Sequence, residues 1–162
     1  MKFDFHDFYN RLLNRTDFWS DIWNEFPKGG FQFKNFLLPS LVENLTKKDS
    51  KALSCTLACI FYDGADKDYT QTLLDLLEEK WHTSEEDIVE ILGQIRDPKS
   101  IEILYKIALV VPDYDEMRAL AKKCLNALRS INTADAREKV IQIGAMNAPI
   151  IKEFAQLQLN NW

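Results

Sequence analysis

The sequence is poor in the residue types that most catalytic and cofactor-binding motifs require. Its 162 residues include two histidines, three cysteines and five glycines. It contains no Gly-x-Gly-x-x-Gly, Walker loop, Gly-x-Ser-x-Gly or His-Glu-x-x-His motif, so the signatures of nucleotide-binding, α/β-hydrolase and zinc-protease sites are missing. We therefore expect a protein that is not an enzyme, with no catalytic residue, cofactor or metal site.

The sequence also lacks long apolar runs and a regular cysteine framework. No stretch approaches the roughly 18 consecutive apolar residues of a membrane span. Acidic residues stand in the first positions, where a signal peptide would have its apolar run. Cys55 and Cys59 lie four residues apart in an apolar helical run, and either a redox pair or two small core residues explains them; we favour the core, and Cys124 is interpreted in the same way. We expect a cytoplasmic protein that is monomeric when free, without membrane contact.

What the chain does have is an uneven negative charge. The net charge is -5, and residues 37–97 alone carry six basic and 13 acidic residues. Binding to nucleic acid needs clustered cations to neutralise phosphates, so this balance argues against a nucleic-acid partner. It favours a partner protein with a basic surface.

Aromatic residues are concentrated near the N-terminus, with 11 of the 19 in residues 1–36. Their spacing predicts a helix over 5–14 and a second one that starts at Thr16 and ends at 27–30. Such bulky stripes form either a binding surface or a cap over the open end of a hydrophobic core. We favour a cap over 1–33.

From residue 34 onward the hydrophobic pattern is helical throughout, and no segment alternates with a period of two. Ser84 with Asp87 resembles a capping box, and His82 is expected in a solvated turn. The fold class is therefore all-α in a single domain, 1–162. The expected helices are 34–46, 50–62, 67–80, 84–96, 99–110, 114–130, 134–144 and 147–159.

An internal repeat supports this organisation. Residues 92–104, Leu-Gly-Gln-Ile-Arg-Asp-Pro-Lys-Ser-Ile-Glu-Ile-Leu, recur in outline 36 residues later at 128–140. Asp97 is expected to cap the helix that Pro98 opens, and Leu92, Ile101 and Leu104 to lie in the core, together with Ile95. The segment resembles the HEAT repeat, which implies about four helix pairs over 34–162, stacked as a right-handed α-solenoid. In the later unit Thr133-Ala134 replaces Asp-Pro, a departure from the repeat pattern.

The acidic segment supplies the candidate binding residues. Turns and helix starts account for several of its carboxylates, but Glu78 and Glu79 close a helix, where a negative charge opposes the helix dipole. Either a surface for a basic partner or a merely solvated face explains the segment, and aromatic residues among the acids favour an interface. The candidates are Asp63, Asp66, Asp68, Tyr69, Glu78, Glu79, Trp81, Glu85, Glu86, Asp87 and Glu90.

Size, charge and architecture are similar to those of the immunity proteins of bacterial toxin systems, including contact-dependent growth inhibition. This resemblance implies an inhibitor that occludes a basic toxin domain such as a nuclease. A general HEAT-repeat scaffold is the alternative hypothesis. A HEAT-like lyase or DNA-glycosylase relative is more remote, because the sequence offers no reactive group and only a small basic region.

Overall fold

In the computed structural model every regular element of the described residues is a helix, which confirms the all-α prediction. The structure describes residues 3–14, 19–27, 29–111, 117–146 and 148–162. The α-helices are α1 (Phe5–Asn14), α2 (Trp19–Glu25), α3 (Lys34–Lys47), α4 (Ser50–Asp63), α5 (Thr70–Glu78), α6 (Glu85–Ile95), α7 (Ile101–Leu109), α8 (Ala119–Ile131), α9 (Ala134–Gly144) and α10 (Pro149–Asn160); two 3₁₀ turns, η1 (Lys67–Tyr69) and η2 (Pro98–Ser100), precede α5 and α7.

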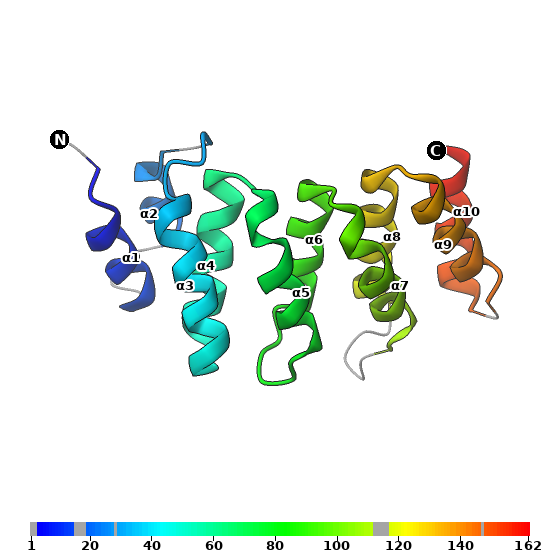
Figure 1. Cartoon of the computed structure of the whole chain (residues 1–162), viewed down its shortest axis with the longest axis horizontal. Coiled ribbons are helices and arrows are strands. Elements are labelled where there is room, and N and C mark those ends of the chain that lie inside the picture. The colour runs from blue at the N-terminus through cyan, green and yellow to red at the C-terminus, as the bar shows by residue number, and fades with distance from the viewer. Residues whose placement is uncertain (1–2, 15–18, 28, 112–116, 147) are drawn as a thin grey trace.

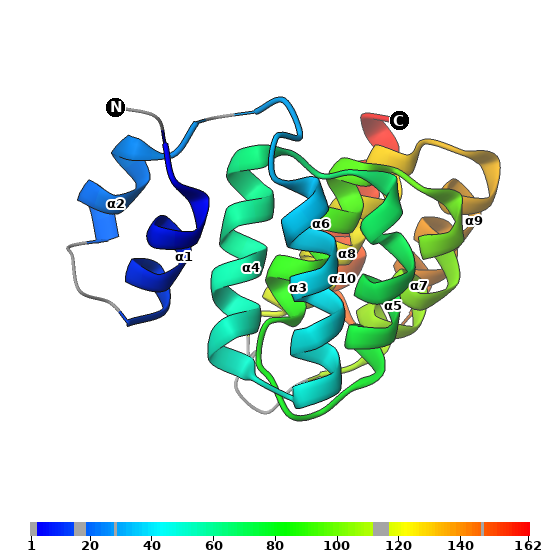
Figure 2. The ribbon, with the colours of Figure 1, turned by 60° about the vertical axis from the view of Figure 1, so that its left-hand side comes forward.

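Helices α3 to α10 lie in two rows. In one row α4, α6, α8 and α10 pack side by side, and in the other α3 packs on α5 and α7 on α9 (Figure 2). Successive helices run in opposite directions (Figure 1). The α4–α5, α6–α7 and α8–α9 connections therefore lie along one edge of the molecule, the upper edge in Figure 1, and the α3–α4 and α5–α6 connections lie along the lower edge.

The 36-residue repeat is present in the backbone. Arg96 and Asn132 end α6 and α8 in the left-handed conformation, with φ of 60° and 57°. Each donates its backbone N–H to the carbonyl four residues earlier, on Leu92 and Leu128. The two helices therefore end in the same way, as the sequence repeat predicts.

The following helices also begin alike. The Asp97 side chain accepts the Lys99 N–H at 3.0 Å, which confirms Asp97 as the predicted cap, and Pro98 opens the 3₁₀ turn. Thr133, 36 residues after Asp97, accepts the Ala136 N–H at 3.2 Å. A hydroxyl thus replaces the carboxylate in the second unit without loss of the cap.

The aromatic N-terminus is part of the core, which supports the cap interpretation. Phe8 is fully buried and Phe5 nearly so. Trp23 stacks on Tyr62 of α4 with ring centroids 4.3 Å apart. The predicted helix start at Thr16 lies outside the described residues.

Two predictions about helix termini were wrong. The Ser84 side chain makes no capping hydrogen bond, although α6 does begin beside it. The α5 helix ends at Glu78, two residues before the predicted boundary. The predicted start of the helix over 114–130 lies outside the described residues; α8 begins at Ala119, after Arg118 with a left-handed φ of 57°.

The core positions follow the pattern. Leu92 and Leu104 are fully buried, Ile101 is nearly so, and Ile95 packs against the core from its margin. The three cysteines are buried, as the core interpretation predicted. No helix in the described part of the chain has the length and apolar character needed to cross a membrane.

Candidate functional site

The predicted acidic residues do not share one surface. The first group follows α4 and the second group follows α5, and antiparallel neighbours place these two connections at opposite edges (Figure 1). We call Asp63, Asp66 and Asp68 the upper acidic cluster. The lower acidic cluster consists of Glu78, Glu79, Glu85, Glu86, Asp87 and Glu90. The two groups therefore lie at opposite edges of the stack of helices.

Asp63 is a structural residue. Its side chain is fully buried and accepts backbone N–H groups from Gln32 at 2.7 Å and from Phe33 at 3.0 Å. These donors precede α3, so the carboxylate fixes the chain at the start of that helix. Asp63 does not belong to a partner-binding surface, and the sequence interpretation is corrected on this point.

The other two carboxylates of the upper cluster also have partners inside the chain. The Asp66 side chain accepts the Asp68 N–H at 2.8 Å, and Lys34 Nζ lies 3.1 Å from Asp66 and also contacts Asp68. The Asp68 N–H first, and then Lys34, hold the pKa of Asp66 below its ordinary value. Tyr69 is fully buried, so it is not the exposed anchor that the sequence suggested. The upper cluster thus stabilises its own connection.

The lower acidic cluster has many more acidic than basic residues around it. Residues 71–90 contain seven carboxylates and one basic residue, Lys80. Glu79 lies 3.5 Å from Lys48, which comes from the neighbouring α3–α4 connection. Glu78, Glu85 and Asp87 have no ion pair or hydrogen bond from their side chains in the described part of the chain.

A single lysine bridges the α6 part of the cluster to α8. Lys123 Nζ lies 3.4 Å from Glu86 and 3.1 Å from Glu90. Burial opposes the charge of Lys123, but the hydrogen bonds to Glu90 and Glu86 outweigh it and raise the pKa of the lysine. Partial burial raises the pKa of Asp87; the charge of Lys123 opposes this shift, and the charges of Glu90 and Glu86 add to it.

The connection that carries this cluster is held in place by a histidine. His82 is buried, not solvated as predicted: its Nδ1 accepts the Ser84 N–H at 3.1 Å, so the proton is on Nε2, which donates to the Leu76 carbonyl at 2.9 Å. The ring meets Trp81 edge-on with centroids 4.8 Å apart. Trp81 is half-buried, and its Nε1 has no acceptor among the described residues. These hydrogen bonds fix the backbone of the α5–α6 connection, which carries the acidic residues.

Metal-ligand groups and cysteine thiols can be compared directly with the sequence expectations. No group of three or more histidine, cysteine, aspartate or glutamate side chains among them is placed to hold a metal ion. Burial raises the pKa of the Cys59 and Cys124 thiols, which disfavours the reactive thiolate.

Sequence reasoning missed two features. Lys123 forms an ion pair with Glu90, which is 33 residues away in the sequence, and no local sequence pattern predicts this contact. A second apolar stripe on α10, formed by Ile150, Phe154 and Leu157, was detectable from its spacing, because it runs beside the stripe that enters the core. Comparison of the chain with protein-family models, curated proteins and solved structures finds no significant match.

Proposed function

We propose that this protein is a non-catalytic binding module that uses the lower acidic cluster to engage a partner with a basic surface. One observation carries the proposal: the side chains of Glu78, Glu85 and Asp87 have no ion pair or hydrogen bond among the described residues, and only Asp87 feels the charge of a nearby lysine, Lys123. In the upper cluster, by contrast, every carboxylate has a hydrogen-bond or ion-pair partner within the chain. Unpaired carboxylates around a fixed connection attract cations and lose little freedom on binding.

The partner we favour is a basic toxin domain with a phosphate-binding cleft, such as a nuclease. Carboxylates of the lower cluster would occupy the positions of substrate phosphates, and Trp81 at the margin would add apolar contact. In this form the protein acts as an immunity protein in the cytoplasm, a monomer until it meets the toxin, and blocks the cleft by occlusion. It needs no cofactor for this role.

The fold belongs to the same proposal. The two rows of helices and the repeated ends of α6 and α8 support a HEAT-like α-solenoid of about four helix pairs, and a right-handed superhelix is the form that we assign to it.

A capture experiment tests the function. The bait proteins are the natural chain, the lower-cluster variant Glu78→Lys/Asp87→Lys and the control Asp135→Lys/Glu138→Lys, which changes net charge equally on exposed positions of α9. Native lysate is passed over each bait at low and high salt, and retained proteins are quantified by mass spectrometry. We expect one basic protein on the natural chain and the control, lost at high salt and lost from the lower-cluster variant. Equal retention by both variants would contradict the proposal.

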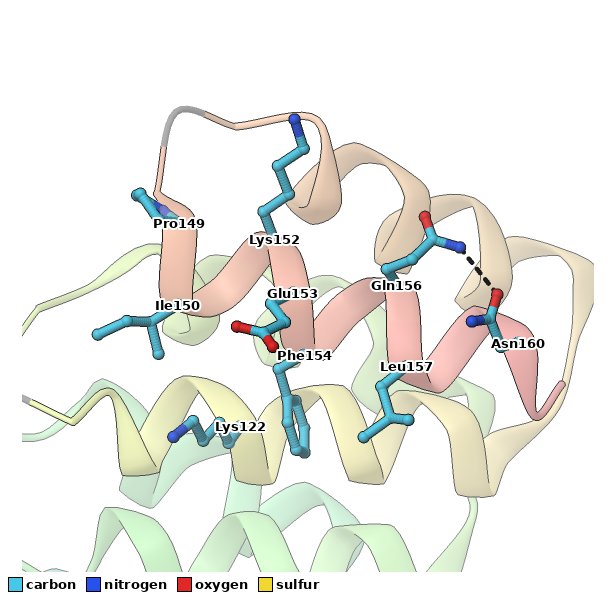
Figure 3. Close-up of a pocket in the computed structure, with 9 residues that line it drawn as sticks. All are labelled: Lys122, Pro149, Ile150, Lys152, Glu153, Phe154, Gln156, Leu157 and Asn160. Carbon is cyan, nitrogen blue, oxygen red and sulfur yellow. Dashed lines mark hydrogen bonds between the residues drawn. The ribbon is translucent and has the colours of Figure 1, made fainter.

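A scaffold remains the second candidate, and a specific observation favours it. A groove between α8 and α10 has an apolar wall formed by Ile150, Phe154 and Leu157 (Figure 3), and its lining comes from other helices than the lower acidic cluster. A protein with two such surfaces is suited to hold two partners.

A further inference from the structure

Another groove lies at the N-terminal end of the stack, between α1 and α3. Helix α1 packs on α4 (Figure 2), and the groove runs beside this contact, with residues at the start of α4 completing its lining. It encloses about 470 Å³. Its wall includes Tyr9 of α1 and Phe36 of α3, whose ring centroids are 5.3 Å apart. This groove plays no part in the function proposed for the lower acidic cluster.

A buried asparagine of this groove has an acceptor that the protein does not use. Asn44 lines the groove and is only 5% exposed. The Thr56 hydroxyl donates to the Ala52 carbonyl at 3.0 Å, so the Thr56 oxygen acts as an acceptor toward its other neighbours. Asn44 Nδ2 donates to that oxygen at 2.7 Å, and the Tyr9 hydroxyl donates to it at 2.8 Å. These bonds fix the orientation of the Asn44 amide, and Oδ1 receives no hydrogen bond from the described residues, so a bound N–H donor would stabilise it.

The neighbouring part of α3 also presents oxygens. Pro39 lies inside the helix and has no N–H to donate to the carbonyl of Asn35, four residues earlier. The Ser40 hydroxyl donates to the Phe36 carbonyl at 2.9 Å, so its oxygen is left as an acceptor. All four residues line the groove. This side of α3 therefore suits a ligand that donates hydrogen bonds.

The charged lining residues of the groove are Glu43, Lys47 and Asp49, so one carboxylate is in excess. Lys47 contacts Glu43, four residues earlier. Asp49 caps α4 by accepting the Ala52 N–H at 3.0 Å and forms no ion pair in the described part of the chain. The hydrogen bond to Glu43 and, more weakly, the charge of Asp49 raise the pKa of Lys47, so this end of the groove favours an ammonium group.

We infer that this groove binds an organic cation, an alkylammonium or guanidinium group, whose N–H groups donate to Asn44 Oδ1 and whose apolar stem packs on Tyr9 and Phe36. Oxygen acceptors form their stronger hydrogen bonds with charged donors, the excess carboxylate selects positive charge, and aromatic rings attract cations. The group belongs either to a free amine or guanidine or to a lysine or arginine side chain of a partner protein.

An NMR titration of the full chain tests the inference. The probes are butylguanidinium and butylurea, which has a similar shape and N–H groups but no charge. The side-chain amide signal of Asn44 reports binding. We expect a saturable shift of this signal, with a Kd for butylguanidinium at least about fivefold lower than that for butylurea. Absence of a saturable shift, or equal Kd values for the two probes, would overturn the inference.

Point variants then locate the site. Ser40→Leu fills the groove, and Ser54→Leu is its matched control, because Ser54 also donates to the carbonyl four residues earlier but is exposed on α4 outside the groove. We expect at least about a tenfold rise in the Kd of butylguanidinium for Ser40→Leu and none for Ser54→Leu. Asp49→Asn keeps a capping side chain and should raise Kd by about two- to fivefold. Equal Kd values for the two leucine variants would contradict the assignment of the site.

A third titration distinguishes the two sources of the cation. The blocked tripeptide acetyl-Gly-Arg-Gly-amide is compared with butylguanidinium on the natural chain. Binding of the peptide that is as tight or tighter assigns the groove to a side chain of a partner protein. Weaker binding of the peptide assigns it to a free small cation. Failure of both probes to bind would overturn the inference and would leave the proposal for the lower acidic cluster unaffected.

Discussion

The two acidic connections of this protein look alike in sequence and differ in use. At the upper edge, Asp63 accepts two backbone N–H groups and Asp66 and Asp68 share Lys34. At the lower edge, the carboxylates outnumber their partners. The comparison teaches that the number of acids in a segment does not reveal a binding surface; the number of acids left without an internal donor or cation does.

The largest expected effect comes from the buried member of the upper cluster. Asp63→Ala leaves the Gln32 and Phe33 N–H groups without their acceptor, so we expect a loss of about 2–3 kcal/mol in the free energy of unfolding. Urea denaturation followed by circular dichroism measures it. The lower-edge counterpart Glu78→Ala should stay within about 0.5 kcal/mol of the natural chain. Similar losses of unfolding free energy in the two variants would mean that the upper acids contribute no more to stability than the lower ones.

A smaller loss is expected at the histidine that holds the lower connection. His82→Leu keeps an apolar side chain in place but leaves the Leu76 carbonyl and the Ser84 N–H without their partner. We expect about 1–2 kcal/mol of destabilisation in the same urea experiment. Thr83→Ala, on the exposed neighbouring residue, is the control and should change little. If His82→Leu left the free energy of unfolding unchanged, the hydrogen bonds of His82 would not be what fixes the connection that carries the lower acidic cluster.

The smallest effect concerns the pH dependence of the upper cluster. The pKa of Asp66 is lowered in the folded chain, so this group contributes stability above its unfolded pKa of about 4, and that stability is lost as pH falls through the folded pKa. Lys34→Met removes part of the lowering and raises the pKa of Asp66 toward its ordinary value. The free energy of unfolding should then fall less between neutral pH and about pH 3 than in the natural chain.

Two measurements check that expectation. Carboxyl titration by NMR reports the pKa of Asp66 directly, and urea denaturation across the pH range reports the stability. Lys48→Met at the lower edge is the control, because Lys48 is largely exposed and lies 3.5 Å from Glu79. If Lys34→Met and Lys48→Met show the same pH dependence, the upper cluster is no better neutralised than the lower one.

The sequence anticipated the features that depend on local order. Hydrophobic periodicity located the helices, and the repeat anticipated the common build of the α6–α7 and α8–α9 turns, with Asp97 as the cap. Those features depend on residues close in the chain, so the spacing of side chains reveals them.

The features that the sequence did not reveal depend on contacts between distant residues. Asp63 meets its donors 30 and 31 residues earlier in the chain, and Lys123 meets Glu90 from 33 residues away. The burial of His82 follows from how its connection folds over the end of α5. Residue type alone placed all of these groups on the surface, and only the packing separates structural acids from free ones.

The most direct test of the central claim is the salt dependence of association. The basic partner obtained by capture is mixed with the natural chain, with Glu78→Lys/Asp87→Lys and with Asp135→Lys/Glu138→Lys in a stopped-flow instrument at increasing ionic strength. We predict that the association rate of the natural chain and of the control falls steeply with salt, and that the lower-cluster variant associates at least about tenfold more slowly at low salt. Equal rates and equal salt dependence for all three proteins would contradict the claim that the lower acidic cluster is the binding surface.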